Sequence, residues 1–94
     1  MSRTRIRVEE VLVYLGVSDR RGFLERLREE GLFEAEEIEP EEADDLRLAK
    51  LLMDELGVNA AGVEVVLHLR KRLLALEERA RFLADTVAAG RRGR

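Results

Sequence analysis

The residues that could do chemistry in this sequence are one histidine, a run of carboxylates and several groups of arginines. His68 could serve as a base or a metal ligand, but the chain has no cysteine, and Glu64 is the single potential partner at helical spacing. We therefore expect an exposed Glu64–His68 pair. The glycines are too scattered for a phosphate loop, and the carboxylates lack the alternating pattern of a calcium loop. The sequence predicts that the protein is not an enzyme and uses no cofactor or metal.

Charge is distributed unevenly along the chain, although its net value is only −3. Between Glu29 and Asp45 there are ten acidic residues and no basic one. Clustered charge of one sign steers association with an oppositely charged partner. A hydrated acidic loop is the alternative interpretation for any single residue. The acidic surface expected to bind a partner consists of Glu29, Glu30, Glu34, Glu36, Glu37 and Glu39.

A long helix is predicted from Asn59 to about Ala89, with Asn59 as its N-cap after Gly57. Apolar residues recur along it at alternating spacings of three and four, which is the heptad pattern of a coiled coil. Little else in so short a chain could cover this stripe, so we expect a homodimer. The alternative is a long amphipathic helix folded back on its own domain. The residues expected to form the dimer are Val66, Leu69, Leu73, Leu76, Ala80, Leu83 and Val87.

Parallel and antiparallel order both stay open at this point. A pair between Arg72 and Glu77 could form across a parallel dimer, but one pair does not decide the orientation.

Two short helices are expected at the start of the chain. The first covers Ile6 to Leu15, with a short strand possible at its beginning, and ends at Gly16. The second is capped by Ser18 or Asp19 and has an inward face of Phe23, Leu24 and Leu27. Two helices joined by so short a connection are typical of a helix-turn-helix.

A short connection or a small β-wing should follow, with Leu32, Phe33 and Ile38 buried. Pro40 then fits the first turn of a third helix. Its expected core face consists of Ala43, Leu46, Ala49, Leu52, Met53 and Leu56, widened by Leu48 and Leu51.

The expected fold class is therefore all-α. Residues 6–58 should form the helix-turn-helix domain with the third helix, and residues 59–89 a helix that packs on the core and continues as a coiled coil. Residues 1–5 and 90–94 are expected to be flexible tails. Without a leader or a membrane-spanning run, the expected location is the cytoplasm.

The helix-turn-helix outline suggests DNA binding, but the acidic residues near the second helix oppose it. A groove-reading module needs positive charge near the phosphates. The second helix carries Arg20, Arg21, Arg26 and Arg28, but eight acidic residues from Asp19 to Glu39 lie beside them.

Part of the sequence resembles a known family. LRLAKLLMDELGVNAAGVEVVLHLRKRLLALE is similar to the small CbpM-type chaperone modulators, and the order of parts, with VEEVLVYLGVS and LREEGLF, resembles the MerR-like group. HspR-type heat-shock repressors share part of the most diagnostic stretch, Leu56 to Leu67. DNA-binding relatives usually carry an arginine and paired aromatics where this chain has Glu25, Arg26 and Leu27.

The resemblance implies a MerR-like helix-turn-helix with a short acidic wing, a third helix and a dimerising coiled coil. It also implies a non-enzymatic regulator that binds the J-domain of a DnaJ- or CbpA-like co-chaperone and limits its contact with the chaperone DnaK. The alternatives are a heat-shock transcription regulator that binds DNA and a structural adaptor that assembles DnaK and DnaJ.

Overall fold

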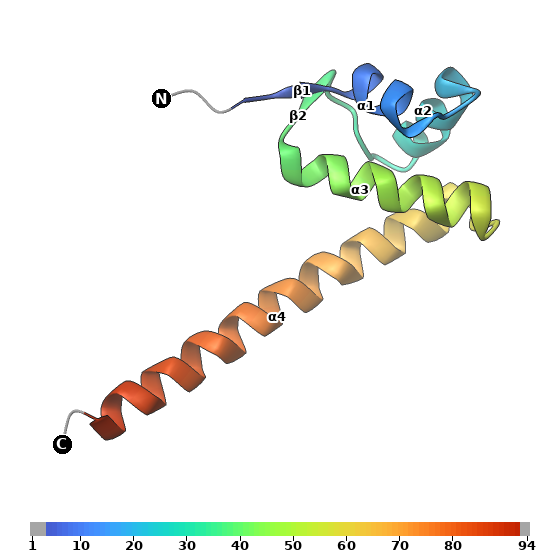
Figure 1. Cartoon of the computed structure of the whole chain (residues 1–94). Coiled ribbons are helices and arrows are strands. Elements are labelled where there is room, and N and C mark those ends of the chain that lie inside the picture. Colours follow the sequence, from blue (N-terminus) through green and yellow to red (C-terminus); the bar gives the residue numbers. More distant parts are fainter. Residues whose placement is uncertain (1–3, 93–94) are drawn as a thin grey trace.

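The structure, a computed structural model, describes residues 4–92 as a mostly helical chain with a small sheet. A helical domain lies at one end, and one long helix projects from it (Figure 1). The radius of gyration is 17.6 Å, whereas a compact chain of this length would have about 12 Å. The elements in chain order are β1 (Ile6–Arg7), α1 (Val8–Leu15), α2 (Arg20–Glu29), β2 (Glu37–Ile38), α3 (Pro40–Lys50), the π-helical turn η1 (Leu51–Glu55) and α4 (Ala60–Arg92).

The two short N-terminal helices form as predicted. α1 buries Val8, Val11 and Leu12 and ends where Gly16 adopts a left-handed conformation with φ of 75°. Asp19, one of the two predicted caps, starts α2 by accepting a hydrogen bond from the Gly22 N–H at 3.1 Å. The predicted inward face of α2 is buried as well.

The predicted wing contains one short strand, β2, and does not form a hairpin by itself. β2 pairs antiparallel with β1, so that Ile6 lies opposite Ile38 and Arg7 opposite Glu37. The possible strand at the chain's beginning is therefore present, and it is the partner of the wing strand. Ile38 is buried as predicted, whereas Leu32 and Phe33 are only half-buried. These two lie in the connection between α2 and β2.

α3 begins with a capping box. The Glu39 carboxylate accepts from the backbone of Glu42, and the Glu39 N–H donates to the Glu42 carboxylate at 3.2 Å. Pro40 stands at the first turn, as predicted. On the inner face of this helix, Leu46 and Ala49 are fully buried.

The predicted core face of the third helix is wrong at its C-terminal end. Leu51 is 41% exposed and Leu56 is 64% exposed. The cause is η1, in which the Leu56 N–H donates to the Leu51 carbonyl at 3.2 Å, five residues back. Because a π turn holds more residues than an α turn, the spacing that keeps leucines on one face no longer applies beyond Lys50.

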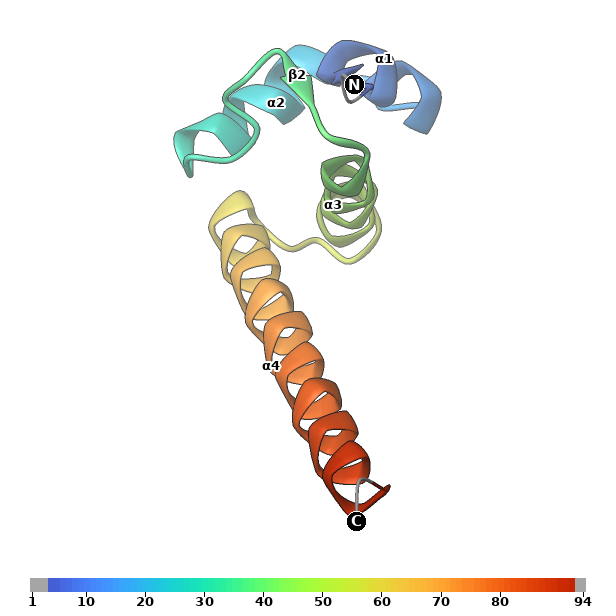
Figure 2. The same cartoon turned by 90° about the vertical axis from the view of Figure 1, so that its left-hand side faces the viewer.

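α4 starts at the predicted cap, since the Asn59 side chain accepts from the Gly62 N–H at 2.8 Å. The domain buries only its first turns, through Val63 and Leu67. The helix extends beyond the predicted end at Ala89 to Arg92, and both views show its C-terminal end far from the domain (Figures 1 and 2). At about 1.5 Å per residue it is about 50 Å long.

The predicted N-terminal tail is shorter than expected. Arg5 donates to the Glu37 carbonyl at 3.4 Å and lies 3.9 Å from the Glu39 carboxylate, so it contacts the domain. The rest of the predicted tails, at residues 1–3 and 93–94, lies outside the described residues.

The cap of α2 gives a first test. Replacing Asp19 with alanine removes an acceptor from a free N–H group of the helix, so the free energy of unfolding should fall by about 1 kcal/mol. Ser18→Ala, at the neighbouring exposed position, is the matched control and should change stability much less. Urea denaturation at a fixed protein concentration measures both. Equal losses for the two variants would contradict the assignment of the cap.

Candidate interaction surfaces

Seven residues of α4 form an apolar stripe, which we call the seam: Val66, Leu69, Leu73, Leu76, Ala80, Leu83 and Val87. Within one chain, the leucines of the seam and Val87 are between 54% and 58% exposed. Val66 is half-buried, because it lies beside the last contacts of α4 with its domain. Monomeric proteins rarely expose an apolar stripe of this length, so the seam is a candidate surface for a partner.

Five of the six predicted acidic residues are exposed: Glu29, Glu30, Glu34, Glu36 and Glu37. They extend from the end of α2 along the connection to β2. Glu39 was predicted to bind a partner, and the structure gives it another role. It is half-buried, caps α3 and lies near Arg5, so we leave it out of the acidic surface.

The acidic surface has a basic border. A shallow hollow of about 420 Å³ beside β2 is lined by Arg5, Arg7, Ala35, Glu36 and Glu37. Arg5 and Arg7 therefore weaken the acidic field near β2. Composition alone did not reveal this basic border, because Arg5 and Arg7 are far from the acidic run in the sequence.

Two of the four arginines of α2 contact other parts of the domain. The Arg28 Nε donates to the carbonyl of Phe33 at 2.9 Å, where the backbone of Phe33 is left-handed with φ of 52°. Arg20 lies 3.9 Å from the carboxylate of Glu9. Arg21 and Arg26 remain exposed. Arg21 and Arg26 are therefore the two arginines of α2 without such a contact among the described residues.

His68 lies on the exposed side of α4, as the heptad register predicted. It lines a hollow of about 200 Å³ between α4 and the connection after α2, together with Glu64. Among residues 4–92 it takes part in no ion pair, so the predicted Glu64–His68 pair is not formed. The same residues include no group of His, Cys, Asp and Glu that could hold a metal ion.

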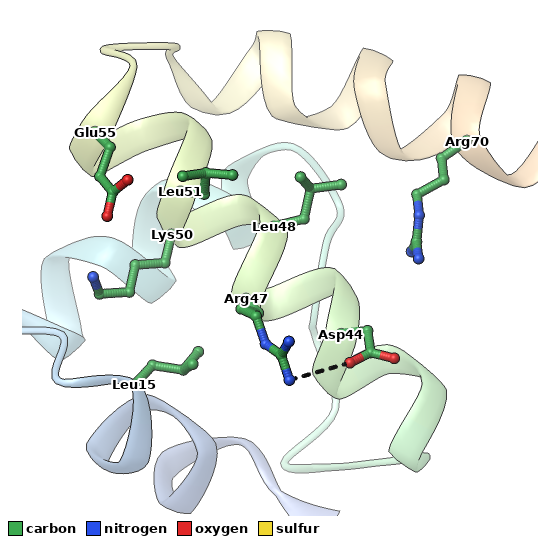
Figure 3. A pocket seen from close by; sticks show the side chains of 8 residues that line it. All are labelled: Leu15, Asp44, Arg47, Leu48, Lys50, Leu51, Glu55 and Arg70. Atoms are coloured by element: carbon green, nitrogen blue, oxygen red, sulfur yellow. Dashed lines mark ion pairs between the residues drawn. The ribbon is translucent and has the colours of Figure 1, made fainter.

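A hollow beside α3 is a surface that the sequence did not reveal. We name it the α3–α4 groove; it has a volume of about 600 Å³. Leu48 and Leu51 point into it from α3 and η1, and Arg70 points into it from α4 (Figure 3). Leu15 lies at its α1 side. The groove exists because η1 turns Leu51 out of the core, whereas the sequence predicted this leucine to be buried.

An ion pair links α3 to α4 beside the groove. The Arg70 Nη1 donates to the Asp45 Oδ1 at 2.6 Å, joining α4 to α3. Burial raises the pKa of Asp45 above its ordinary value of 3.8, while the charges of Arg70 and Lys71 act to lower it. Because the pKa of this carboxyl is higher in the folded state, its contribution to stability is present below pH 3.8 and is lost as the pH rises through the folded-state pKa.

The ion pair predicts a specific pH dependence. Arg70→Met should raise the pKa of Asp45 further and lower the free energy of unfolding at pH 7 by about 1 kcal/mol, a modest value because Arg70 is 42% exposed. The loss should shrink as the pH falls and Asp45 becomes protonated. NMR titration of the Asp45 carboxyl and urea denaturation measure the two effects. In the Asp45→Asn background, Arg70→Met should lower the free energy of unfolding much less than it does in the wild type. Additive losses in the double variant would show that the two side chains are not coupled.

The seam predicts a dimer that a single charge can break. Leu76→Arg would bury an unpaired charge at the middle of the seam and weaken the dimer by about 3 kcal/mol or more. Since Leu76 is 58% exposed in one chain, the monomer should stay folded. Sedimentation equilibrium and circular dichroism report both quantities. Leu74→Arg, outside the seam at 51% exposure, is the control and should remain a dimer; full dimerisation of Leu76→Arg would refute the seam.

Comparison with known proteins provides no independent identification. The sequence matches no protein-family model and no curated protein, and the structure matches no solved structure. Across residues 4–92, no helix combines the length and the apolar character needed to cross a membrane.

Proposed function

We propose that this protein is a non-enzymatic chaperone modulator that acts as a homodimer in the cytoplasm and binds the J-domain of a DnaJ- or CbpA-like co-chaperone. The resemblance of the segment around Leu56 to Leu67 suggests this class. The observation that carries the proposal is the set of exposed carboxylates from Glu29 to Glu37. A J-domain presents a basic helix to DnaK, so an acidic surface that binds this helix would compete with DnaK.

The order of the elements supports a MerR-like helix-turn-helix as the scaffold of this surface. Two short helices, a wing strand, a third helix and a long helix follow one another in that order. In such a scaffold α2 would be the element that reads DNA. Between Thr4 and Glu39, however, six basic residues face ten acidic ones. Because the phosphate backbone repels a surface of this charge, the scaffold fits a protein partner better than a DNA duplex.

Binding through the acidic surface is compatible with two effects on the co-chaperone, inhibition and assembly into a complex. A modulator that occupies the basic helix of the J-domain would inhibit the encounter with DnaK. A dimer has two such surfaces, so it could also hold two co-chaperone molecules in one assembly. Competition between the modulator and DnaK for an isolated J-domain separates inhibition from assembly.

The acidic surface should control the rate of association with the partner. We expect the J-domain of the cognate co-chaperone to bind the wild-type chain, with an affinity that falls as salt rises. Changing Glu34, Glu36 and Glu37 together to lysine should slow association at low salt by about tenfold or more. Their side chains are exposed, so the fold and the dimer should be unchanged. Surface-binding kinetics on both proteins measure the rate.

A matched control separates local from general electrostatics. Glu10, Glu78 and Asp85 are exposed acidic residues outside the run, and their change to lysine alters the net charge equally. This control should associate at close to the wild-type rate. Equal rates for the wild type and the Glu34/Glu36/Glu37 variant would remove the acidic surface from the mechanism. Tight, sequence-selective binding to DNA from chaperone-gene promoters at about physiological salt would favour the repressor instead.

A further inference from the structure

The outer face of α1 carries two exposed apolar side chains. Val11 and Leu12 belong to the inner face of this helix and are buried in the core, whereas Val13 is 57% exposed and Tyr14 is 86% exposed. No other large apolar side chain among residues 4–92 is as exposed as Tyr14. Figures 1 and 2 show α3 between α1 and the projecting part of α4, so the long helix of the same chain does not cover this face.

Two shallow hollows flank Tyr14. One has a volume of about 540 Å³ and is lined by Val13 together with Arg7, Glu9 and Glu10. The other has a volume of about 250 Å³ and lies between α1 and α3. Because Tyr14 lines both hollows, a partner that fills them would bury its ring from two sides. Buried tyrosines of this kind are common anchors of protein–protein interfaces.

Carboxylates border the apolar centre of this face. Glu10 precedes Val13 by three residues and Tyr14 by four, so it lies one helical turn from both. Glu9 lies 3.9 Å from Arg20, whereas Glu10 forms no ion pair among residues 4–92. The Glu10 carboxylate is therefore available to a basic side chain of a partner. An apolar centre with a polar rim is the usual anatomy of a protein interface.

The outer face of α1 is continuous with the acidic surface. The Val8 N–H at the start of α1 donates to the Glu36 carbonyl at 2.9 Å, and Arg7 pairs with Glu37 in the two-stranded sheet. Arg7 also lines both the hollow beside Tyr14 and the hollow beside β2. A partner that contacts Glu36 and Glu37 therefore reaches Tyr14 by extending over Arg7.

The acidic surface itself offers no large apolar side chain for a partner to bury. Leu32 and Phe33 lie within the acidic run, but both are half-buried and pack against the core of their own domain. Exposed charges mainly change the rate of association, whereas buried contacts determine how slowly a complex dissociates. A complex that persists therefore needs apolar surface next to the carboxylates.

We propose that the outer face of α1, with Val13 and Tyr14 at its centre, anchors the partner that the acidic surface attracts. Its occupant is a helix that has apolar side chains on one face and lysines or arginines beside them. The apolar side chains fill the hollows at Tyr14, and the basic ones lie against Glu10, Glu36 and Glu37. The inference rests on the proposed function, in which this helix belongs to the J-domain of a co-chaperone, and it adds the contact that sets the lifetime of the complex.

The dissociation rate of the J-domain complex tests the anchor. Tyr14→Ala should release the J-domain of the cognate co-chaperone about tenfold faster than the wild type, with little change in the association rate. Tyr14→Phe keeps the ring and should release it at close to the wild-type rate. Phe82→Ala is the matched control, because it removes a ring that is 68% exposed on α4 outside the seam. Surface-binding kinetics measure the rates, and circular dichroism checks the fold.

Salt separates the anchor from the acidic surface. Exposed charges are screened by salt, whereas apolar burial is not. The ratio of the dissociation rates of Tyr14→Ala and the wild type should therefore be similar in about 0.05 M and about 0.5 M sodium chloride. The slower association of the Glu34/Glu36/Glu37 variant should approach the wild-type rate over the same range.

Each result supports or overturns the inference. A wild-type chain that does not bind the J-domain overturns the proposed function and this inference with it. If the wild type binds and Tyr14→Ala dissociates at the wild-type rate, the anchor is excluded and the proposed function stands. An equal effect of Phe82→Ala would show a general disturbance of the molecule and would also exclude the anchor.

Sedimentation equilibrium tests the other possible occupant of this face. If Tyr14→Ala associates with itself more weakly than the wild type does, a second copy of the chain occupies the outer face of α1, and the inference is overturned. Faster release of the J-domain by Tyr14→Ala but not by Phe82→Ala, with unchanged self-association, supports it.

Discussion

The small domain covers only the first turns of α4, and the exposed surface of the molecule depends on this difference in length. Val63 and Leu67 fix the beginning of α4 in a core shared with α1, α2, α3 and β2. The ion pair from Asp45 to Arg70 then fixes its direction. Beyond Leu67 every described side chain of α4 up to Arg91 is exposed. Within one chain these leucines and valines stay exposed, so the free energy of burying them is available for binding a partner.

Local signals in the sequence were sufficient for most of the fold. Asp19 and Asn59 cap helices because their side-chain oxygens reach free N–H groups within one turn, and this depends on neighbouring residues only. Gly16 ends α1 for an equally local reason, its left-handed backbone. Helical spacing likewise predicted Phe23, Leu27 and Leu46 as core residues. The boundaries of the elements therefore follow from short stretches of sequence.

The features that the sequence did not predict depend on contacts between distant segments or on a change of helical phase. Nothing near Leu51 indicates that the hydrogen bonding shifts to a π turn, so Leu51 and Leu56 were assigned to the core, and the α3–α4 groove was missed. Glu39 has the sequence environment of a surface carboxylate, yet the capping box and Arg5 hold it in place. Composition described the acidic run correctly but not its basic border at Arg5 and Arg7.

The acidic surface and the seam would bind their partners through different interactions, charge in the first case and apolar burial in the second. The carboxylates from Glu29 to Glu37 are exposed and carry no apolar anchor, so they act mainly on the rate of encounter. In the proposed dimer, the seam would act through burial of apolar surface and would control how long two copies stay together.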